Sequence, residues 1–136
     1  MKAKVSWIED MAFVGHSETG HKIVMDGDRE GGAPSPMEMV LMSAGTCSAI
    51  DVVSILEKAR QKFINVDVEL SAERAETIPK VFTKIHLHFI VTGVDVQEKH
   101  VERAVNLSAE KYCSVAKMLE KSAEISHSFE IKPAQY

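Results

Sequence analysis

Hydrophobic and polar residues alternate at the start of the chain in the pattern of half-buried strands. In residues 2–8, the polar Lys2, Lys4 and Ser6 alternate with Ala3, Val5 and Trp7, which predicts a strand with one apolar face. Two short β-prone runs follow at residues 12–15 and 21–25, with a polar turn between them. We therefore expect the chain to begin as a meander of three strands.

A polar loop rich in glycine and proline, residues 26–36, leads into a long apolar segment. Ser35 suits the N-cap of a helix, Pro36 suits its first position, and Glu38 completes a Ser-x-x-Glu capping box. The pattern predicts a helix over about residues 36–60, apolar on almost every side along most of its length. Such a helix must be covered on most of its surface.

In the second half of the chain, the hydrophobic pattern is first that of strands, then that of helices, and finally that of a strand again. Two alternating segments, residues 63–70 and 81–91, flank a turn and predict a β-hairpin. Helical periodicity follows over residues 97–112 and continues through 113–121. Residues 124–131 alternate once more and predict a closing strand. The expected order is βββ-α-ββ-αα-β, an α+β fold.

The length of 136 residues points to one domain covering residues 1–136. A helix of roughly 25 residues is about 37 Å long, which is not much shorter than such a domain is wide. The short helices and sheets of one chain cannot wrap this central helix on all sides. We therefore expect a homodimer, in which a partner chain helps to bury the helix.

Composition and charge restrict the kinds of partner and compartment that we expect for the protein. The net charge is −4, and the lysines and arginines are scattered, so we expect no nucleic-acid partner. The N-terminus lacks a signal-peptide pattern, and we expect no segment long and apolar enough to span a bilayer and no membrane partner. These features predict a cytoplasmic protein, in which cysteines stay reduced unless they are catalytic.

The chain has two cysteines, and the first, Cys47, falls in the middle of the long helix. The helix dipole does not favour a thiolate there. Asp51 follows four residues later on the same helix face, and its negative charge opposes a thiolate unless a lysine or arginine pairs with it. A carboxylate in an apolar helix needs such a partner or solvent. Cys47 is therefore either part of a polar pocket or an inert buried thiol.

The second cysteine, Cys113, lies near a predicted helix start. Free backbone N–H groups at a helix N-terminus favour a thiolate, and Lys111 and Lys117 add positive charge nearby. The alternative is a small residue that packs at a helix junction.

No metal or organic cofactor is expected from the remaining motifs. His86 and His88 share one face of a strand, a spacing that can bind metal but that more often marks a solvated face. The loop with Gly27 and Gly31-Gly32 lacks the lysine and Ser/Thr of a phosphate cradle.

Three segments resemble the OsmC/Ohr family, named for osmotically inducible protein C and the organic hydroperoxide resistance protein. They are the helix opening at residues 36–38, the run Ala-Gly-Thr-Cys-Ser-Ala-Ile-Asp at 44–51, and Tyr-Cys-Ser-Val-Ala-Lys-Met-Leu at 112–119. The resemblance implies an α+β fold of two intertwined chains with thiol peroxidase chemistry at their interface. It implies that Cys47 attacks an organic hydroperoxide, that Cys113 resolves the product as a disulfide, and that a lipoyl-type dithiol is the reductant.

The sequence departs from the peroxidase pattern at two charged positions. The family glutamate, ten residues before the first cysteine, is replaced by Met37, and the stretch 11–21 contains no arginine, so that Arg29 is the nearest candidate. The leading interpretation is an organic hydroperoxide reductase whose apolar pocket walls include Met37 and Leu41. The alternatives are a non-catalytic relative that binds a small apolar ligand and a redox sensor that forms the disulfide without turnover.

Overall fold

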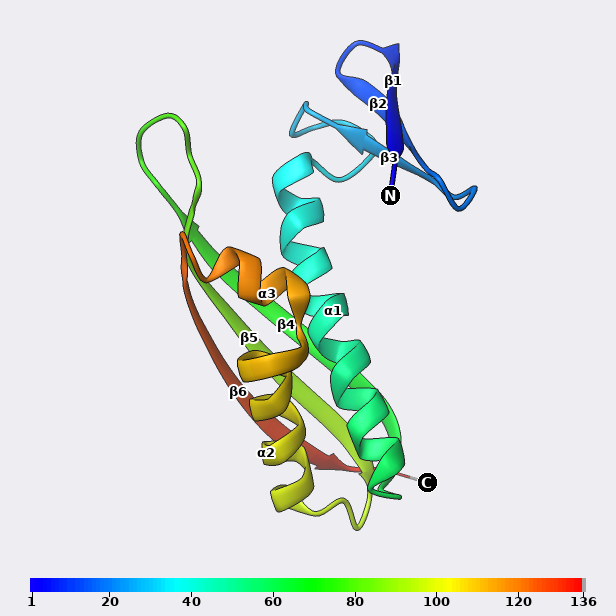
Figure 1. Ribbon diagram of the computed structural model, residues 1–136, viewed down its shortest axis with the longest axis vertical. Helices are drawn as coiled ribbons and strands as arrows, with labels where there is room; N and C mark the ends of the chain where they lie inside the picture. The colour runs from blue at the N-terminus through cyan, green and yellow to red at the C-terminus, as the bar shows by residue number, and fades with distance from the viewer. Residues whose placement is uncertain (136) are drawn as a thin grey trace. The chain divides into compact units, whose positions relative to one another are not determined.

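The elements follow the expected α+β order in the computed structural model, which describes residues 1–135 (Figure 1). They are β1 (Ala3–Glu9), β2 (Ala12–Ser17), β3 (Lys22–Asp26), α1 (Pro36–Lys58), β4 (Lys62–Arg74), β5 (Phe82–Val94), α2 (Glu98–Leu107), a π-helical turn η1 (Ser108–Tyr112), α3 (Ser114–Leu119) and β6 (Glu124–Pro133). Two compact units divide the chain between Val40 and Leu41, inside α1. Each unit is described by itself below.

The first unit is a three-stranded antiparallel sheet in the order β1-β2-β3. Trp7 lies opposite Phe13, which lies opposite Met25, so these side chains share one face of the sheet. Trp7 is 67% exposed and Val5, on the same face, is 62% exposed. A cavity of about 410 Å³ lies over this face. The sheet therefore presents an uncovered apolar surface.

The capping box predicted for the start of α1 is present. The Glu38 amide donates to Ser35 Oγ at 3.2 Å, and the Ser35 amide donates back to Glu38 Oε1 at 3.1 Å. The helix ends two residues before the predicted Arg60, which adopts a positive φ of 56°. The Gln61 and Arg60 amides then donate to the carbonyls of Leu56 and Glu57, which is the hydrogen-bond pattern of a Schellman motif.

Within one chain, α1 buries a single stripe of residues. The buried positions are Ala44, Gly45, Ser48, Val52 and Leu56, whereas Ile50 is 62% exposed and Met42 is 43% exposed. The helix is long and apolar enough to cross a membrane by length and composition. The expectation that no segment meets this criterion was wrong, although a core helix of a soluble protein meets it too.

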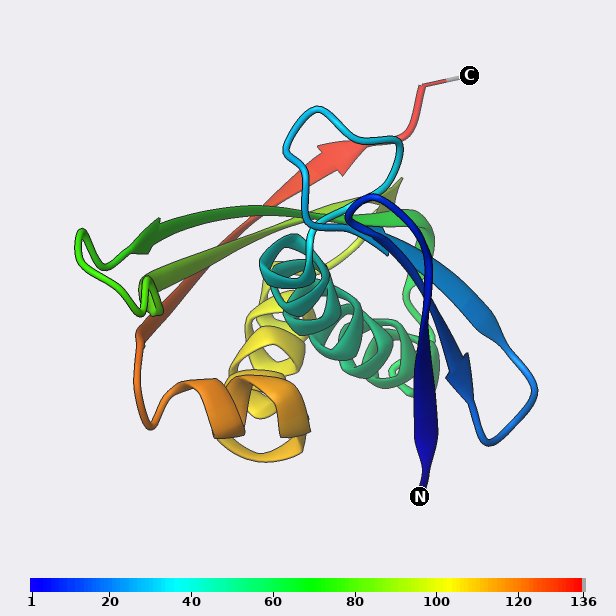
Figure 2. The ribbon, with the colours of Figure 1, turned by 90° about the horizontal axis from the view of Figure 1, so that it is seen from above.

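The second unit contains the sheet β4-β5-β6, in which β4 and β5 form the predicted antiparallel hairpin. Strand β6 runs parallel to β5. Helices α1, α2 and α3 lie on the same side of this sheet (Figure 2). The core between helices and sheet consists mainly of Val52, Leu56, Ile85, Leu87, Phe89, Val91, Val101 and Val105. Gly45 allows α1 to approach β4 closely, because an added Cβ would lie 2.6 Å from Leu70 Cδ1.

The two helices predicted over residues 97–112 and 113–121 are both present, with a π-helical turn between them. A π-helical turn follows α2, in which the Cys113 amide donates to the Ser108 carbonyl at 2.9 Å. Cys113 is extended, with φ −77° and ψ 100°, and α3 begins at the next residue. Cys113 is therefore the N-cap of α3 rather than a residue inside a helix.

Candidate functional site: two thiols between α1 and α3

The structure brings the two cysteines together. Cys47 lies on α1 and is partly exposed, and Cys113 lies at the start of α3 and is fully buried. Their side chains are close enough to interact, since Cys47 acts directly on the Cys113 thiol. Both are free thiols in this structure.

Burial dominates the chemistry of Cys113. It raises the pKa of the thiol above its ordinary value, and the neighbouring Cys47 acts in the same direction. The Ser48 hydroxyl and the Ala116 amide, which donates to Cys113 Sγ at 3.4 Å, favour the thiolate and oppose this rise in pKa. The expectation that the helix start makes Cys113 a ready thiolate was wrong, because the cost of burying the charge exceeds the gain from the N–H groups.

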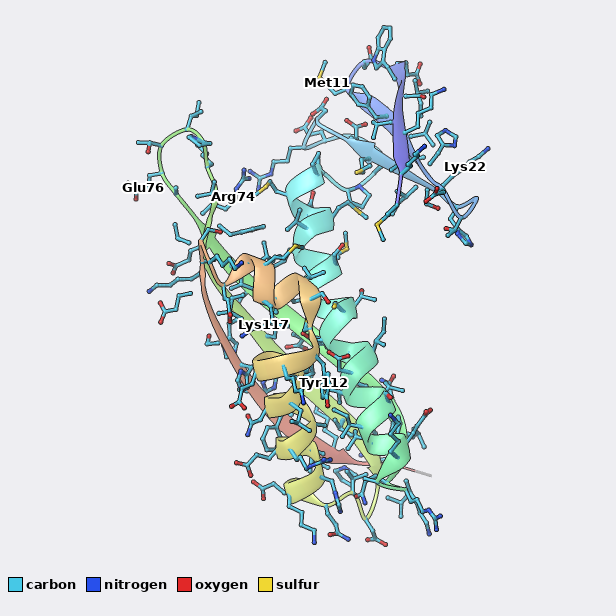
Figure 3. All side chains as sticks on the ribbon, in the orientation of Figure 1. Met11, Lys22, Arg74, Glu76, Tyr112 and Lys117 are labelled. Atoms are coloured by element: carbon cyan, nitrogen blue, oxygen red, sulfur yellow. The ribbon has the colours of Figure 1, made fainter. Side chains whose placement is uncertain are left out.

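The two lysines near Cys113 in the sequence have other partners. Lys117 Nζ lies 2.7 Å from Glu120 Oε1 in an ion pair on the surface of α3. Lys111 Nζ lies 5.3 Å from the centre of the Tyr112 ring. Figure 3 labels Lys117 on α3 and Tyr112 at the turn before it. Neither positive charge is directed at the thiol, so the predicted lysine support is not found.

Asp51 is paired with a hydroxyl rather than with a cation. Ser108 Oγ donates to Asp51 Oδ2 at 2.9 Å, and Asp51 forms no ion pair within the described part of the chain. The sequence interpretation offered a lysine or arginine partner, or solvent, and did not foresee this arrangement. The bond joins the middle of α1 to the π-helical turn that positions Cys113.

Ser48 and Ser108 are functional candidates that the sequence interpretation missed. They are 3% and 1% exposed, respectively, and they contact Cys113 and Asp51. Ser108 falls at an inward position of the helical pattern that also contains Val101 and Val105. A polar residue at a core position of an apolar pattern was the available signal, since buried hydroxyls require partners.

The arginine proposed from the sequence lies near the start of α1. Arg29 contributes a positive charge near Glu38, whose pKa is lowered first by its hydrogen bonds with Ser35 and then by this charge. Arg74 donates from Nε to the Lys80 carbonyl at 2.8 Å. Arg103 lines a cavity together with Asp51. No hydrogen bond joins an arginine to Cys47 among residues 1–135.

The histidine pair on β5 is bound to β6 rather than simply solvated. His86 contacts the hydroxyls of Ser126 and Ser128 at 2.7 and 2.8 Å. His88 contacts Ser128 at 2.7 Å and Glu130 Oε1 at 3.0 Å. Residues 1–135 contain no group of three or more His, Cys, Asp or Glu arranged to hold a metal ion. We interpret the pair as a cross-strand network.

Two cavities of the second unit lie close to the cysteines. One, of about 600 Å³, includes Asp51 and Tyr112 in its lining. The other, of about 250 Å³, lies between the sheet and the helices and includes Ser48 and Ala116, which both contact Cys113. Met37 and Leu41, expected from the sequence to form pocket walls, line neither of them.

The chain is similar in sequence and fold to known proteins. Residues 27–128 match the sequence model of the OsmC-like protein family. The chain is 59% identical to Protein YhfA of Escherichia coli strain K12, over 98% of this chain and all of that protein. A hypothetical protein from Aquifex aeolicus VF5 is 32% identical, with a TM-score of 0.88 and coverage of 98% of this chain and 97% of that one.

A more distant structure shares the fold alone. It is an organic hydroperoxide resistance protein OsmC from Legionella pneumophila, which is 18% identical, with a TM-score of 0.70. The match covers 95% of each chain. The α+β arrangement described above is therefore shared with solved OsmC-like structures.

Proposed function

The chain belongs to the OsmC-like protein family, and from this premise we propose that it is a thiol-dependent peroxidase that reduces organic hydroperoxides in oxidative-stress defence. The observation that carries the proposal is that Cys47 on α1 and Cys113 at the start of α3 lie close enough for Cys47 to act directly on the Cys113 thiol. Two cysteines far apart in the sequence meet at one place in the fold. The name of the Legionella relative, an organic hydroperoxide resistance protein, indicates the substrate class.

The proposed reaction has three balanced steps. The Cys47 thiolate attacks the outer oxygen of ROOH, the O–O bond breaks, and the alcohol ROH leaves with a proton while Cys47 becomes a sulfenic acid. The Cys113 sulfur then attacks the Cys47 sulfur, which forms a disulfide and releases water. A dithiol, of the lipoyl type in our proposal, reduces this disulfide by exchange and is itself oxidised.

The partial exposure of Cys47 and the complete burial of Cys113 support this division of roles. A peroxidatic cysteine must be reachable by the substrate, whereas a resolving cysteine needs to reach only its partner. The Ser48 hydroxyl favours the thiolate of Cys113, which is the nucleophile of the second step. We propose that the protein acts in the cytoplasm as a homodimer.

A redox sensor is the second candidate, and the burial of Cys113 favours it. Burial raises the pKa of this thiol, which slows attack on the sulfenic acid at neutral pH. Asp51 also lacks a cation partner in the described structure. A disulfide that forms slowly and is not rapidly reduced would record oxidant exposure without sustained turnover.

Steady-state consumption of cumene hydroperoxide with a dithiol reductant tests the peroxidase proposal. Cys47→Ser should abolish turnover, whereas Cys113→Ser should allow one fast oxidation of Cys47 and then stop recycling through the disulfide. Ser114→Ala, a change at the exposed neighbour of Cys113, is the matched control and should retain the wild-type rate. Unchanged rates in both cysteine variants would rule out the proposed pair.

A further inference from the structure

The cavity of about 600 Å³ lies between one face of α1 and one face of α2. The α1 side includes Asp51, Ile55 and Lys58, spaced about one helical turn apart. The α2 side includes His100 and Arg103, also one turn apart. The volume falls within the range of small-molecule sites in proteins.

The two ends of this cavity differ in charge. The helices run antiparallel (Figure 1), and the Asp51–Ser108 hydrogen bond joins the middle of α1 to the end of α2. The start of α2, with His100 and Arg103, therefore lies toward Lys58 at the end of α1. One end of the cavity is basic, and the other holds Asp51.

The basic end has no internal counter-charge. Lys58 and Arg103 form no ion pair within residues 1–135, and Asp51, the one carboxylate in the lining, accepts a hydrogen bond from Ser108. The chain as a whole is acidic, with a net charge of −4. A concave basic site on an acidic protein concentrates small anions.

Apolar side chains line the cavity between and beside these charges. Ile55 lies between Asp51 and Lys58 on α1, Ala59 follows Lys58, and Leu107 is at the end of α2. Tyr112 adds a half-exposed phenol (Figure 3). A ligand that matches this lining carries one acidic group and a short apolar body. Apolar walls with a few convergent polar groups are the usual composition of a ligand site.

We propose that this cavity binds a small organic anion, whose carboxylate or phosphate group lies between Lys58 and Arg103 and whose apolar body lies along Ile55 and Leu107. Both headgroups present the same chemistry to the site, an anion that accepts charge-assisted hydrogen bonds. Binding uses neither cysteine, so the proposal does not rest on peroxidase activity.

Calorimetric titration of the reduced protein with octanoate, octyl phosphate and 1-octanol tests this site. At least one of the two anions should bind at least about tenfold more tightly than the neutral alcohol, because only the anions form charge-assisted hydrogen bonds with Lys58 and Arg103. Comparison of the two anions identifies the preferred headgroup. No anion binding, or equal binding of anions and octanol, would overturn the proposal.

Variants that remove one positive charge of the cavity test where the anion binds. Arg103→Gln and Lys58→Gln are at exposed positions and should each weaken anion binding about tenfold without changing octanol binding. Lys99→Gln, on α2 but outside the cavity lining, is the matched control and should bind as wild type does. Wild-type affinity in both cavity variants, or an equal loss in the Lys99 variant, would contradict the assignment.

A space-filling variant provides a second readout that leaves every charge in place. Ala59→Leu enlarges a side chain of the lining beside Lys58 and should exclude the ligand. Thermal unfolding of the variant checks that the fold is retained. Full anion affinity in a folded Ala59→Leu protein would place the ligand outside this cavity.

Discussion

At the scale of single residues, the environment of Cys113 determines which reaction the thiol pair can perform. The side chain is fully buried, with the Ser48 hydroxyl and the Ala116 amide as its donors. Burial opposes the thiolate, while these two donors favour it. Cys113 is therefore better suited to react with a sulfenic acid on the neighbouring Cys47 than to attack the substrate itself.

The raised pKa of Cys113 makes stability depend on alkaline pH. The folded state holds the neutral thiol more firmly than the unfolded state, whose thiol has a pKa of about 8.5. This contribution is complete below the unfolded pKa and is lost as the pH rises through the higher folded value. Urea unfolding of wild type and Cys113→Ala should therefore converge in stability as the pH rises above about 8.5. A constant difference across this range would contradict the assignment.

The effect of the Ser48 hydroxyl should be measurable in the pKa of the Cys113 thiol that it contacts. In a Cys47→Ser background, adding Ser48→Ala removes a donor to the Cys113 thiolate and should move its titration to higher pH. The ultraviolet absorbance of the thiolate follows this titration directly. Ser122→Ala, at an exposed position, is the control. A midpoint that is unchanged or lower in the Ser48 variant would show that the hydroxyl does not favour the thiolate.

The sequence was sufficient to find the two cysteines but not the groups around them. Cys47 and Cys113 were recognisable by residue type and by family resemblance. The roles of Ser48 and Ser108 depend on α1 meeting the π-helical turn, a long-range contact that no local pattern specifies. Burial of Cys113 likewise outweighs the helix-start effect that the sequence predicted.

At the scale of elements, local sequence signals predicted most helix and strand boundaries correctly. The capping box fixes the start of α1, and strand alternation locates β4, β5 and β6. The helix start near Cys113 was predicted, but the π-helical turn at Ser108–Tyr112 was not, because the helical periodicity of the side chains continues through it. A π-helical turn shifts the register of a helix without leaving a compositional mark.

The capping box gives a direct test of the start of α1. Ser35→Ala removes the acceptor of the Glu38 amide and the hydroxyl that favours ionised Glu38. The variant should lose about 1 kcal/mol of unfolding free energy, as N-cap substitutions typically do. Urea unfolding at neutral pH measures the loss, with Ser122→Ala as the control. Unchanged stability would mean that the cap does not hold this helix end.

At the scale of the whole molecule, the apolar surfaces left open in one chain are the main unexplained feature. Ile50 on α1 and Trp7 on β1 are 62% and 67% exposed, respectively. Contiguous exposed apolar residues commonly mark interaction surfaces. This pattern supports the proposed homodimer, in which a second chain covers α1.

Oligomeric state is measurable without knowing the substrate. Sedimentation equilibrium should give twice the chain mass of 15.0 kDa, and Ile50→Asp should shift the protein toward the monomer because it places a charge in the interface. Lys99→Gln, on a polar face of α2, should leave the dimer intact. A wild-type protein that sediments as a monomer at all concentrations would refute the dimer.

The central claim is that Cys47 and Cys113 work as one redox pair, and counting thiols tests it most directly. The reduced protein is treated with one equivalent of cumene hydroperoxide, with hydrogen peroxide in parallel, and free thiols are counted over time. The account predicts rapid loss of both thiols together, faster with the organic peroxide, and recovery of both with a dithiol. Thiols that survive for hours, or loss of Cys47 alone, would contradict it.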